Sequence, residues 1–416
     1  MKFIKFISFT TVICILFSLL FNVQAKEITN LKFDFDVKSA LLMDADSGKV
    51  LYAYKENECL PPASVTKIMT LLLVFEAIEN NYIDYNTLVT ISEYASSMGG
   101  SQVYLEPGEQ ITVDELLKCV FVSSANDGAV ALAELVCGSE EAFVDKMNTR
   151  AEELGMKNTH FENVTGLDDD TINHFTSALD IGIMSRELLK YPNVTSYSKI
   201  WMDTIRNGEF GLTNTNKLVR YYKGITGLKT GSTEKAGFCV SASAKRDNLH
   251  LIAVIMGADS SKNRNIYATK LLDYGFANYS VLKEERNYLT DISVLCGEND
   301  FVKIGTTDKV ILLNKNDLNK IKKEYVYEKE IKAPVAKNQV VGKVVYYLDE
   351  KEVDSSEIVC LEDVDKLTFF EYFIKFIKNV FWLRFSLKKC WIFNKFVVLY
   401  NILFFRGILM IWQPYP

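Results

Sequence analysis

The sequence lacks closely spaced cysteine pairs and has only three histidines. One of its eight cysteines lies within the first 25 residues, and the other seven show no CxxC spacing. An odd number of scattered cysteines favours neither a disulfide framework nor a zinc site, so no metal or other cofactor is predicted. Only His160, His174 and His250 are present, and none lies in a recognisable nucleophile motif. A histidine-activated nucleophile is therefore not indicated.

The charge is unevenly distributed, although the formal net charge is only −6. Residues 366–416 contain eight Lys or Arg and a single Glu, whereas the rest of the chain is acidic. An acidic body argues against a nucleic-acid partner. The basic, aromatic tail instead favours contact with a membrane surface.

The N-terminus has the three-part form of a secretory signal peptide. Two lysines precede an apolar stretch over residues 6–21, and small residues end at Ala25. We expect removal of residues 1–25, and a retained membrane helix is the alternative because the apolar stretch is short for a span. The sequence therefore predicts an exported protein.

The rest of the chain divides by texture into a long first part and two shorter segments. Residues 26–281 show a hairpin pattern over 40–54, helical periodicity in the middle, and strands followed by a helix at the end. This order predicts an α+β domain in which N- and C-terminal strands share an antiparallel sheet flanked by helices. Residues 282–365 contain short alternating apolar runs, which predict a small all-β domain.

Several elements of the first domain can be placed individually. Thr112 to Glu115 has the form of a capping box and starts a helix that runs toward Ser123. The other expected elements are a buried helix from Ser64, helices over 127–155, 176–189 and 264–279, and strands over 224–231, 237–244 and 249–257.

Ser64 and Lys67 are the strongest candidates for catalysis. A spacing of three places both side chains on one helix face, where the lysine amine can take the hydroxyl proton. The positive end of the helix dipole disfavours a protonated ammonium at this position, so the lysine can act as a base. A lone Ser-x-x-Lys tetrapeptide is weak evidence, but Ser124-Ala125-Asn126 and Lys229-Thr230-Gly231 follow it in the chain.

With all three motifs in this order, the sequence resembles the penicillin-recognising serine enzymes. The low-molecular-mass D-alanyl-D-alanine carboxypeptidases are the most similar branch, and the resemblance extends from about Lys38 to Asp363. It implies a penicillin-recognising domain over residues 26–281 with the β-lactamase/transpeptidase-like fold. It also implies peptidoglycan stem pentapeptides as substrate and β-lactam antibiotics as acylating inhibitors.

The resemblance also implies a role for each motif residue. Ser64 is acylated, Lys67 is its base, and Ser124 relays a proton to the leaving group. The expected substrate-binding residues are Asn126, Lys229, Thr230, Gly231, Ser232 and Arg264. Within this set, the backbone N–H groups of Ser64 and Ser232 would form the oxyanion hole.

Two further assignments are less specific. Arg264 matches an arginine that helps to bind the substrate carboxylate in the family, and a surface arginine that caps a helix is the alternative. The run from His160 to Leu167 also fits the family, and we expect it to serve packing and not catalysis.

Residues 366–416 are predicted to anchor the chain to a membrane. The charges of Glu371, Lys375 and Lys378 recur at helical spacing and leave an aromatic remainder, which is typical of an amphipathic interfacial helix. Beyond it, residues 391–412 form a second apolar stretch that contains Lys395 and Arg406. A second interfacial helix and a membrane span both remain open for this stretch. Together with the signal peptide, the tail predicts a location at the outer face of the cytoplasmic membrane.

The leading functional hypothesis is therefore a serine carboxypeptidase that removes the terminal D-alanine from stem pentapeptides through an acyl-Ser64 intermediate. A serine β-lactamase is an alternative, but no Glu-x-x-Leu-Asn segment lies between Asn163 and Lys229 to position a deacylating water. A catalytically idle penicillin-binding scaffold is a second alternative. The intact motifs argue against it.

Overall fold

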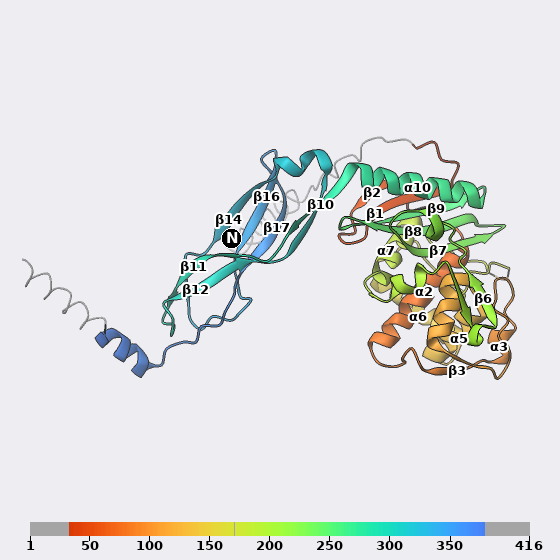
Figure 1. The fold of residues 1–416 in the computed structure, drawn as a ribbon, viewed down its shortest axis with the longest axis horizontal. Coiled ribbons are helices and arrows are strands. Elements are labelled where there is room, and N and C mark those ends of the chain that lie inside the picture. Colours follow the sequence, from red (N-terminus) through yellow and green to blue (C-terminus); the bar gives the residue numbers. More distant parts are fainter. Residues whose placement is uncertain (1–32, 170, 379–416) are drawn as a thin grey trace, which may run out of the picture. The chain divides into compact units, whose positions relative to one another are not determined.

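The computed structural model describes residues 33–169 and 171–378, and the chain divides into two compact units after Ser280 (Figure 1). Each unit has a hydrophobic core of its own. The predicted signal peptide and residues 379–416 of the predicted anchor lie outside the described residues. Within the described ranges, no helix has the length and apolarity that a membrane span requires.

The first unit combines a central sheet with helices and short peripheral strands. Its elements, in chain order, are β1 (Ser39–Asp44), β2 (Val50–Tyr54), the 3-10 helix η1 (Ala63–Thr66), α2 (Lys67–Glu79), β3 (Leu88–Thr90), α3 (Glu93–Ser96), β4 (Gln110–Thr112), α4 (Val113–Lys118), the π-helical turn η2 (Cys119–Ser123), α5 (Asn126–Cys137), α6 (Glu140–Glu153), α7 (Ala178–Leu188), α8 (Val194–Ser198), β5 (Met202–Ile205), the 3-10 turn η3 (Arg206–Gly208), β6 (Phe210–Thr213), α9 (Leu218–Tyr221), β7 (Ile225–Thr233), β8 (Gly237–Arg246), β9 (Leu249–Ala258) and α10 (Ser261–Asn278).

The five-stranded sheet has the order β2-β1-β9-β8-β7, and all neighbouring strands are antiparallel. Strand β1 from the start of the unit lies beside β9 from its end, with Leu42 opposite Ala253. The predicted sharing of one sheet by N- and C-terminal strands is therefore confirmed. Strand β7 is one of the two edge strands, and it carries the Lys229-Thr230-Gly231 motif.

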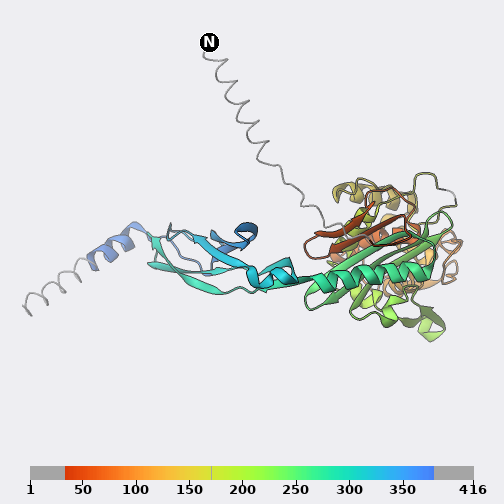
Figure 2. The same cartoon turned by 90° about the horizontal axis from the view of Figure 1, so that it is seen from above.

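Helices cover both faces of this sheet, as Figures 1 and 2 show. Helix α10 packs on one face against β8 and β9, and α7 packs on the other face against β1 and β9. Helix α2 lies against α7, and every residue from Lys67 to Phe75 is buried. The prediction of a helix buried within the domain is thus confirmed, and this helix places Lys67 in the middle of the unit.

Some predicted boundaries differ from the observed ones for local reasons. The helix expected from Ser64 opens as a 3-10 turn, and α2 itself begins at Lys67. The expected helix over 127–155 is two helices, because Gly138 ends α5 at a φ of +83° and Ser139 caps α6. The capping box at Thr112 is present, with both reciprocal hydrogen bonds to Glu115.

The second unit is all-β in its core, as predicted. A six-stranded sheet has the order β14-β16-β17-β12-β11-β15, and β10 pairs with β13 in a separate two-stranded sheet. The strands and one 3-10 helix are β10 (Tyr279–Glu284), β11 (Tyr288–Leu295), β12 (Phe301–Thr306), β13 (Lys309–Asn314), η4 (Lys315–Lys320), β14 (Lys322–Tyr327), β15 (Glu330–Lys332), β16 (Val340–Leu348) and β17 (Lys351–Cys360).

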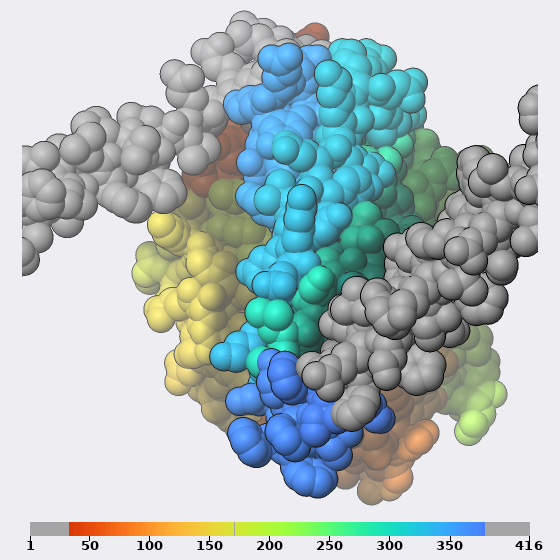
Figure 3. All heavy atoms as spheres, turned by 90° about the vertical axis from the view of Figure 1, so that its left-hand side faces the viewer, coloured from red at the N-terminus to blue at the C-terminus, as the bar shows by residue number. Residues whose placement is uncertain are grey.

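A last helix covers residues 369–378, where the predicted anchor starts. Thr368 and Glu371 form a capping box at its start. Its aromatic residues are exposed, with Phe369 at 88% and Phe370 at 70%. Figure 3 shows this helix as the darkest blue atoms at the surface of the second unit.

Candidate active site

Ser64 and Lys67 meet at the junction between η1 and α2. The Nζ atom of Lys67 lies 2.9 Å from Oγ of Ser64. Ser64 stands in the 3-10 turn and Lys67 in the first turn of the α-helix, and a spacing of three suits both geometries. The hydroxyl and the amine are therefore within the hydrogen-bond reach that general base catalysis needs.

Two oxygen atoms besides the serine hydroxyl surround the Lys67 amine. Nζ donates to Oδ1 of Asn126 at 2.6 Å and to the backbone carbonyl of Thr165 at 2.7 Å. The side chain is fully buried, and burial lowers the pKa of Lys67 well below its ordinary value. The nearby Lys229 lowers this pKa further, whereas Asp127 opposes the shift. The surroundings thus favour the neutral amine.

A neutral amine has two N–H bonds and one lone pair. The amide oxygen of Asn126 and the carbonyl oxygen of Thr165 can only accept hydrogen bonds, so together they engage both N–H bonds. The lone pair is then left for the third neighbour, which is the hydroxyl of Ser64. The arrangement aims a base at the proton of the serine.

Ser124 and Asn126 reach the site from the junction between η2 and α5. The π-helical turn is followed by Ser124, which has a left-handed φ of 62°, and Asn126 is the first residue of α5. The amide of Asn126 also donates from Nδ2 to the carbonyl of Gly99 at 2.7 Å, so both ends of this side chain are engaged. Its orientation toward Lys67 is therefore fixed.

Strand β7 forms the opposite wall of the site. Nζ of Lys229 donates to Oγ of Ser124 at 2.7 Å and to the carbonyl of Thr230 at 2.9 Å. Burial, and next the charge of Arg264, lower the pKa of Lys229 to about 7. Thr230 donates from Oγ1 to Thr215 at 2.8 Å.

Gly231 lets β7 approach the serine closely. A Cβ atom added to this glycine would lie 2.8 Å from the backbone nitrogen of Ser64 and 2.9 Å from that of Val65. Any side chain here would push the strand away from η1. The next residue, Ser232, is exposed and is thus accessible at the mouth of the site.

Arg264 is 5% exposed, so the alternative of a surface capping arginine is wrong. Helix α10 begins at Ser261 with Ser260 as its N-cap, and Arg264 therefore lies inside the helix. Its Nε donates to Oδ1 of Asn265 at 3.1 Å. Burial lowers the pKa of Arg264 to about 10. The charge of Arg264 lowers the pKa of Lys229, so a second positive charge lies close to the Lys229 ammonium.

Two contributors to the site were not recognised as such from the sequence. Thr165 belongs to the run assigned to packing, yet its carbonyl contacts Lys67. Asp127 is fully buried, and its carboxylate accepts from the backbone N–H groups of Val103 and Leu105. Every residue has a backbone carbonyl, so the residue type at position 165 could not indicate this contact. Asp127, in contrast, could have been noticed as a charge directly after Asn126.

Two of the histidines, which the sequence did not indicate as bases, contact threonine hydroxyls. The ring of His174 contacts Oγ1 of Thr66 at 2.8 Å, and that of His250 contacts Oγ1 of Thr226 at 3.0 Å. In the described part of the chain, no group of three or more His, Cys, Asp or Glu residues is arranged to hold a metal ion.

Comparison with known proteins agrees with this geometry. The family model described as D-alanyl-D-alanine carboxypeptidase matches residues 24–260, and that of the penicillin-binding protein 5 C-terminal domain matches residues 276–366. D-alanyl-D-alanine carboxypeptidase DacF of Bacillus subtilis is 42% identical over 84% of this chain and 91% of its own length. DacA of Escherichia coli is 34% identical over 83% of this chain and 88% of its own.

Solved structures give the same result. Penicillin-binding protein 5 of Haemophilus influenzae aligns with a TM-score of 0.70 at 33% identity, over 81% of this chain and 99% of that one. Penicillin-binding protein D2 of Listeria monocytogenes in its ampicillin-bound form aligns with a TM-score of 0.55 at 28% identity, over 59% and 100% of the two chains.

Proposed function

The chain belongs to the D-alanyl-D-alanine carboxypeptidase family of serine peptidases, and we propose that Ser64 and Lys67 carry out its acyl-transfer chemistry. The substrate is a peptidoglycan stem pentapeptide that ends in D-alanyl-D-alanine. The observation that carries the proposal is the Lys67 amine, which is buried, has its two N–H bonds engaged, and faces the Ser64 hydroxyl.

In the acylation step, the neutral amine of Lys67 takes the proton of Ser64 while Oγ attacks the carbonyl carbon of the last peptide bond. The backbone N–H groups of Ser64 and Ser232 stabilise the oxyanion that forms. Ser124, bonded to Lys229, relays the proton that Lys67 has taken to the departing amine, so D-alanine leaves and both Lys67 and Ser124 return to their starting forms. Water then hydrolyses the ester on Ser64, which releases the shortened stem and restores the serine hydroxyl.

The positive charges around β7 suit a substrate with a terminal carboxylate. Lys229 and Arg264 lie close enough for the charge of one to lower the pKa of the other, and both are buried. Thr230 supplies a hydroxyl beside Lys229, and Gly231 leaves room for the substrate backbone along the strand. A β-lactam carries a carboxylate next to a strained amide, so the same residues can bind it and Ser64 can open its ring.

The direct test is release of D-alanine from a peptide that ends in D-Ala-D-Ala. The wild-type protein should release it, and Ser64→Ala should not. Ser196→Ala, which replaces an exposed serine in α8 outside the motifs, is a suitable control. Absence of release by the wild type, or equal release by Ser64→Ala, would refute the proposal.

The lifetime of the penicillin adduct separates the carboxypeptidase from the two alternatives. A long-lived covalent adduct on Ser64, detected by intact mass, supports the carboxypeptidase. Rapid turnover of penicillin would instead identify a β-lactamase, and no adduct at all would identify an idle scaffold.

We further propose that the protein is exported and tethered to the outer face of the cytoplasmic membrane. The exposed aromatic side chains of the helix over 369–378 support this, because water-exposed phenylalanines on a short helix suit insertion into a membrane interface. The full chain should fractionate with membranes and a chain ending at Asp365 should not. If both fractionate alike, the tail is not the anchor. N-terminal sequencing of the exported protein should begin at Lys26.

A further inference from the structure

We infer that Glu140 is a positioning residue for the reaction, because it holds the segment that presents the Thr165 carbonyl to Lys67. It does not touch the reacting atoms. The inference rests on the proposed role of Lys67 as the base. It assigns a function to a carboxylate that lies in α6, outside all three sequence motifs.

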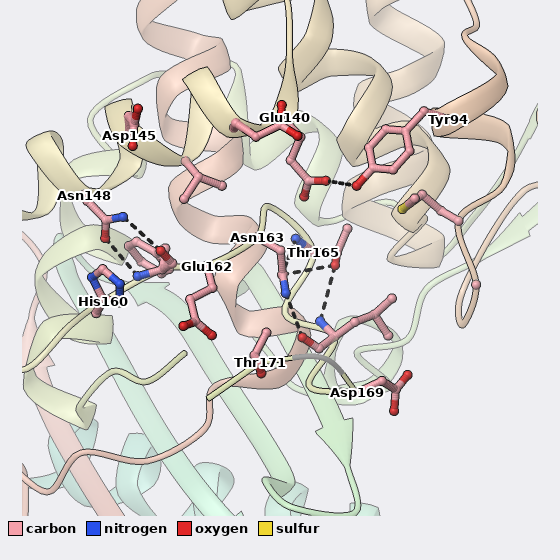
Figure 4. A pocket seen from close by; sticks show the side chains of 16 residues that line it. Tyr94, Glu140, Asp145, Asn148, His160, Glu162, Asn163, Thr165, Asp169 and Thr171 are labelled. Carbon is pink, nitrogen blue, oxygen red and sulfur yellow. Dashed lines mark hydrogen bonds between the residues drawn. The ribbon is translucent and has the colours of Figure 1, made fainter. Parts of the chain in front are cut away.

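The carboxylate of Glu140 is anchored at both oxygens. Oε1 accepts from the backbone N–H of Val164 at 3.0 Å, and Oε2 accepts from the hydroxyl of Tyr94 at 2.5 Å. Figure 4 shows Glu140 facing Tyr94, with Asn163 and Thr165 on the neighbouring segment. Glu140 is 8% exposed, and this hydrogen bond raises the pKa of Tyr94. A buried carboxylate with two partners in fixed directions is a rigid support.

Val164 is held on its other side as well. Its backbone carbonyl accepts from Oγ1 of Thr70, at 2.7 Å, and Thr70 lies one turn after Lys67 in α2. Both backbone polar groups of Val164 are therefore tied, the N–H to α6 and the carbonyl to α2. The next residue, Thr165, carries the carbonyl that accepts from Lys67.

The residues that flank Thr165 leave this peptide little freedom. Oδ1 of Asn163 accepts from the backbone N–H groups of Thr165 and Gly166, at 3.1 and 2.7 Å. Gly166 has a φ of +82°, and a Cβ atom there would lie 1.9 Å from the carbonyl oxygen of Ala63. The turn thus packs directly against η1. A shift of Val164 would move the Thr165 carbonyl away from its hydrogen bond with Lys67.

The consequence for catalysis follows from the two N–H bonds of the neutral amine. With the Thr165 carbonyl displaced, only Asn126 directs the amine, and the lone pair is no longer confined to the Ser64 hydroxyl. The same carbonyl stabilises the protonated amine, so its loss also makes Lys67 easier to deprotonate. A lower maximal rate and an acid limb displaced to lower pH are therefore expected together. General loss of folded enzyme lowers the rate and leaves the limb in place.

The charged groups near these residues are known. Lys229 and Asp127 are the charged groups that act on the pKa of Lys67. Glu140 itself faces a cavity of about 650 Å³ whose lining includes other carboxylates, namely Glu141, Asp145, Glu162 and Asp169. Removal of one negative charge from this lining must therefore be controlled separately from loss of the hydrogen bond to Val164.

Four variants separate the effect of the length of the Glu140 side chain from the effect of its negative charge. Glu140→Gln keeps an acceptor oxygen at the same distance from Val164 but loses the charge. Glu140→Asp keeps the charge but is one methylene shorter, so it cannot reach both Val164 and Tyr94. Glu140→Ala removes both properties. Glu141→Ala removes the same charge from the adjacent, exposed position and serves as the matched control.

The measurement is the second-order rate constant of acylation by a penicillin between pH 5 and 8, with folding checked by circular dichroism. We expect Glu140→Gln and Glu141→Ala to behave like the wild type. Glu140→Asp and Glu140→Ala should lose about 10- to 100-fold at the plateau, with the acid midpoint moved to lower pH. If Glu140→Ala does not fold, the rate constant and the acid midpoint of Glu140→Asp alone test the inference.

The inference is overturned if Glu140→Asp reacts at the wild-type rate with an unchanged midpoint, or if Glu140→Gln is as impaired as Glu140→Asp. Failure of the proposed function would give a different result, because the wild-type protein itself would then form no adduct on Ser64.

Discussion

Lys229 allows a quantitative test of the mechanism through the pH dependence of acylation. Its burial beside Arg264 lowers the pKa to about 7. In the proposed mechanism its ammonium binds the carboxylate of the incoming substrate or penicillin, so only the protonated free enzyme captures ligand efficiently. The value of kcat/KM should therefore fall as the pH rises through neutrality, since this parameter reports ionisations of the free enzyme.

The size of the fall follows from this pKa. With a pKa of about 7, the protonated fraction of Lys229 is about 0.9 at pH 6 and about 0.1 at pH 8, which gives about a tenfold loss of kcat/KM. Lys67 acts in the opposite sense, because acylation needs its neutral form and its lowered pKa sets a limb on the acid side. The two lysines together produce a bell-shaped profile.

The assay is the rate constant of adduct formation with a penicillin, followed by intact mass from pH 6 to 8. Lys229→Arg is the informative variant, because a guanidinium stays protonated throughout this range. Its absolute rate will be lower in so tight a site, but its alkaline limb should disappear. A wild-type rate constant that is flat or rises between pH 6 and 8, or an unchanged limb in Lys229→Arg, would refute the reasoning.

Two substitutions test the surroundings of the site. Gly166→Ala should destabilise the fold by more than Gly155→Ala in thermal denaturation. Both glycines have positive φ, which costs a non-glycine residue about 1 kcal/mol or more, but only Gly166 has atoms within reach of a new Cβ. Asp127→Ala should cost about 1–3 kcal/mol for each amide left unpaired at Val103 and Leu105, measured by urea unfolding. Wild-type stability in either Gly166→Ala or Asp127→Ala would contradict the assigned contacts.

The parts of the fold that could be predicted were those with a strong local pattern. Strands β7 to β9 and the apolar helix after Ser64 are runs of residues that are buried on nearly every side. The capping box at Thr112 is a specific four-residue pattern. The peripheral strands β3 to β6 were not predicted. They have only three or four residues each, too few for an alternation to be recognised.

The candidate site also contains residues that could be predicted from the sequence and residues that could not. Ser64, Lys67, Ser124 and Lys229 could be named because their side chains carry the chemistry, and the structure brings them together. The Thr165 carbonyl could not be named, because every residue has one and its direction depends on Asn163 and on contacts with η1. Glu140 was missed for a related reason, since its partner is an amide N–H that any residue but proline provides.

The proximity of the positive charges of Lys229 and Arg264 has a consequence for the resting protein. Like charges that repel one another in a dry interior strain the empty enzyme, and an anion bound among them relieves that strain. Occupancy by a carboxylate should accordingly make the molecule more resistant to heat. A shift in melting temperature could then report which wall fragments or antibiotics fit, without any turnover being observed.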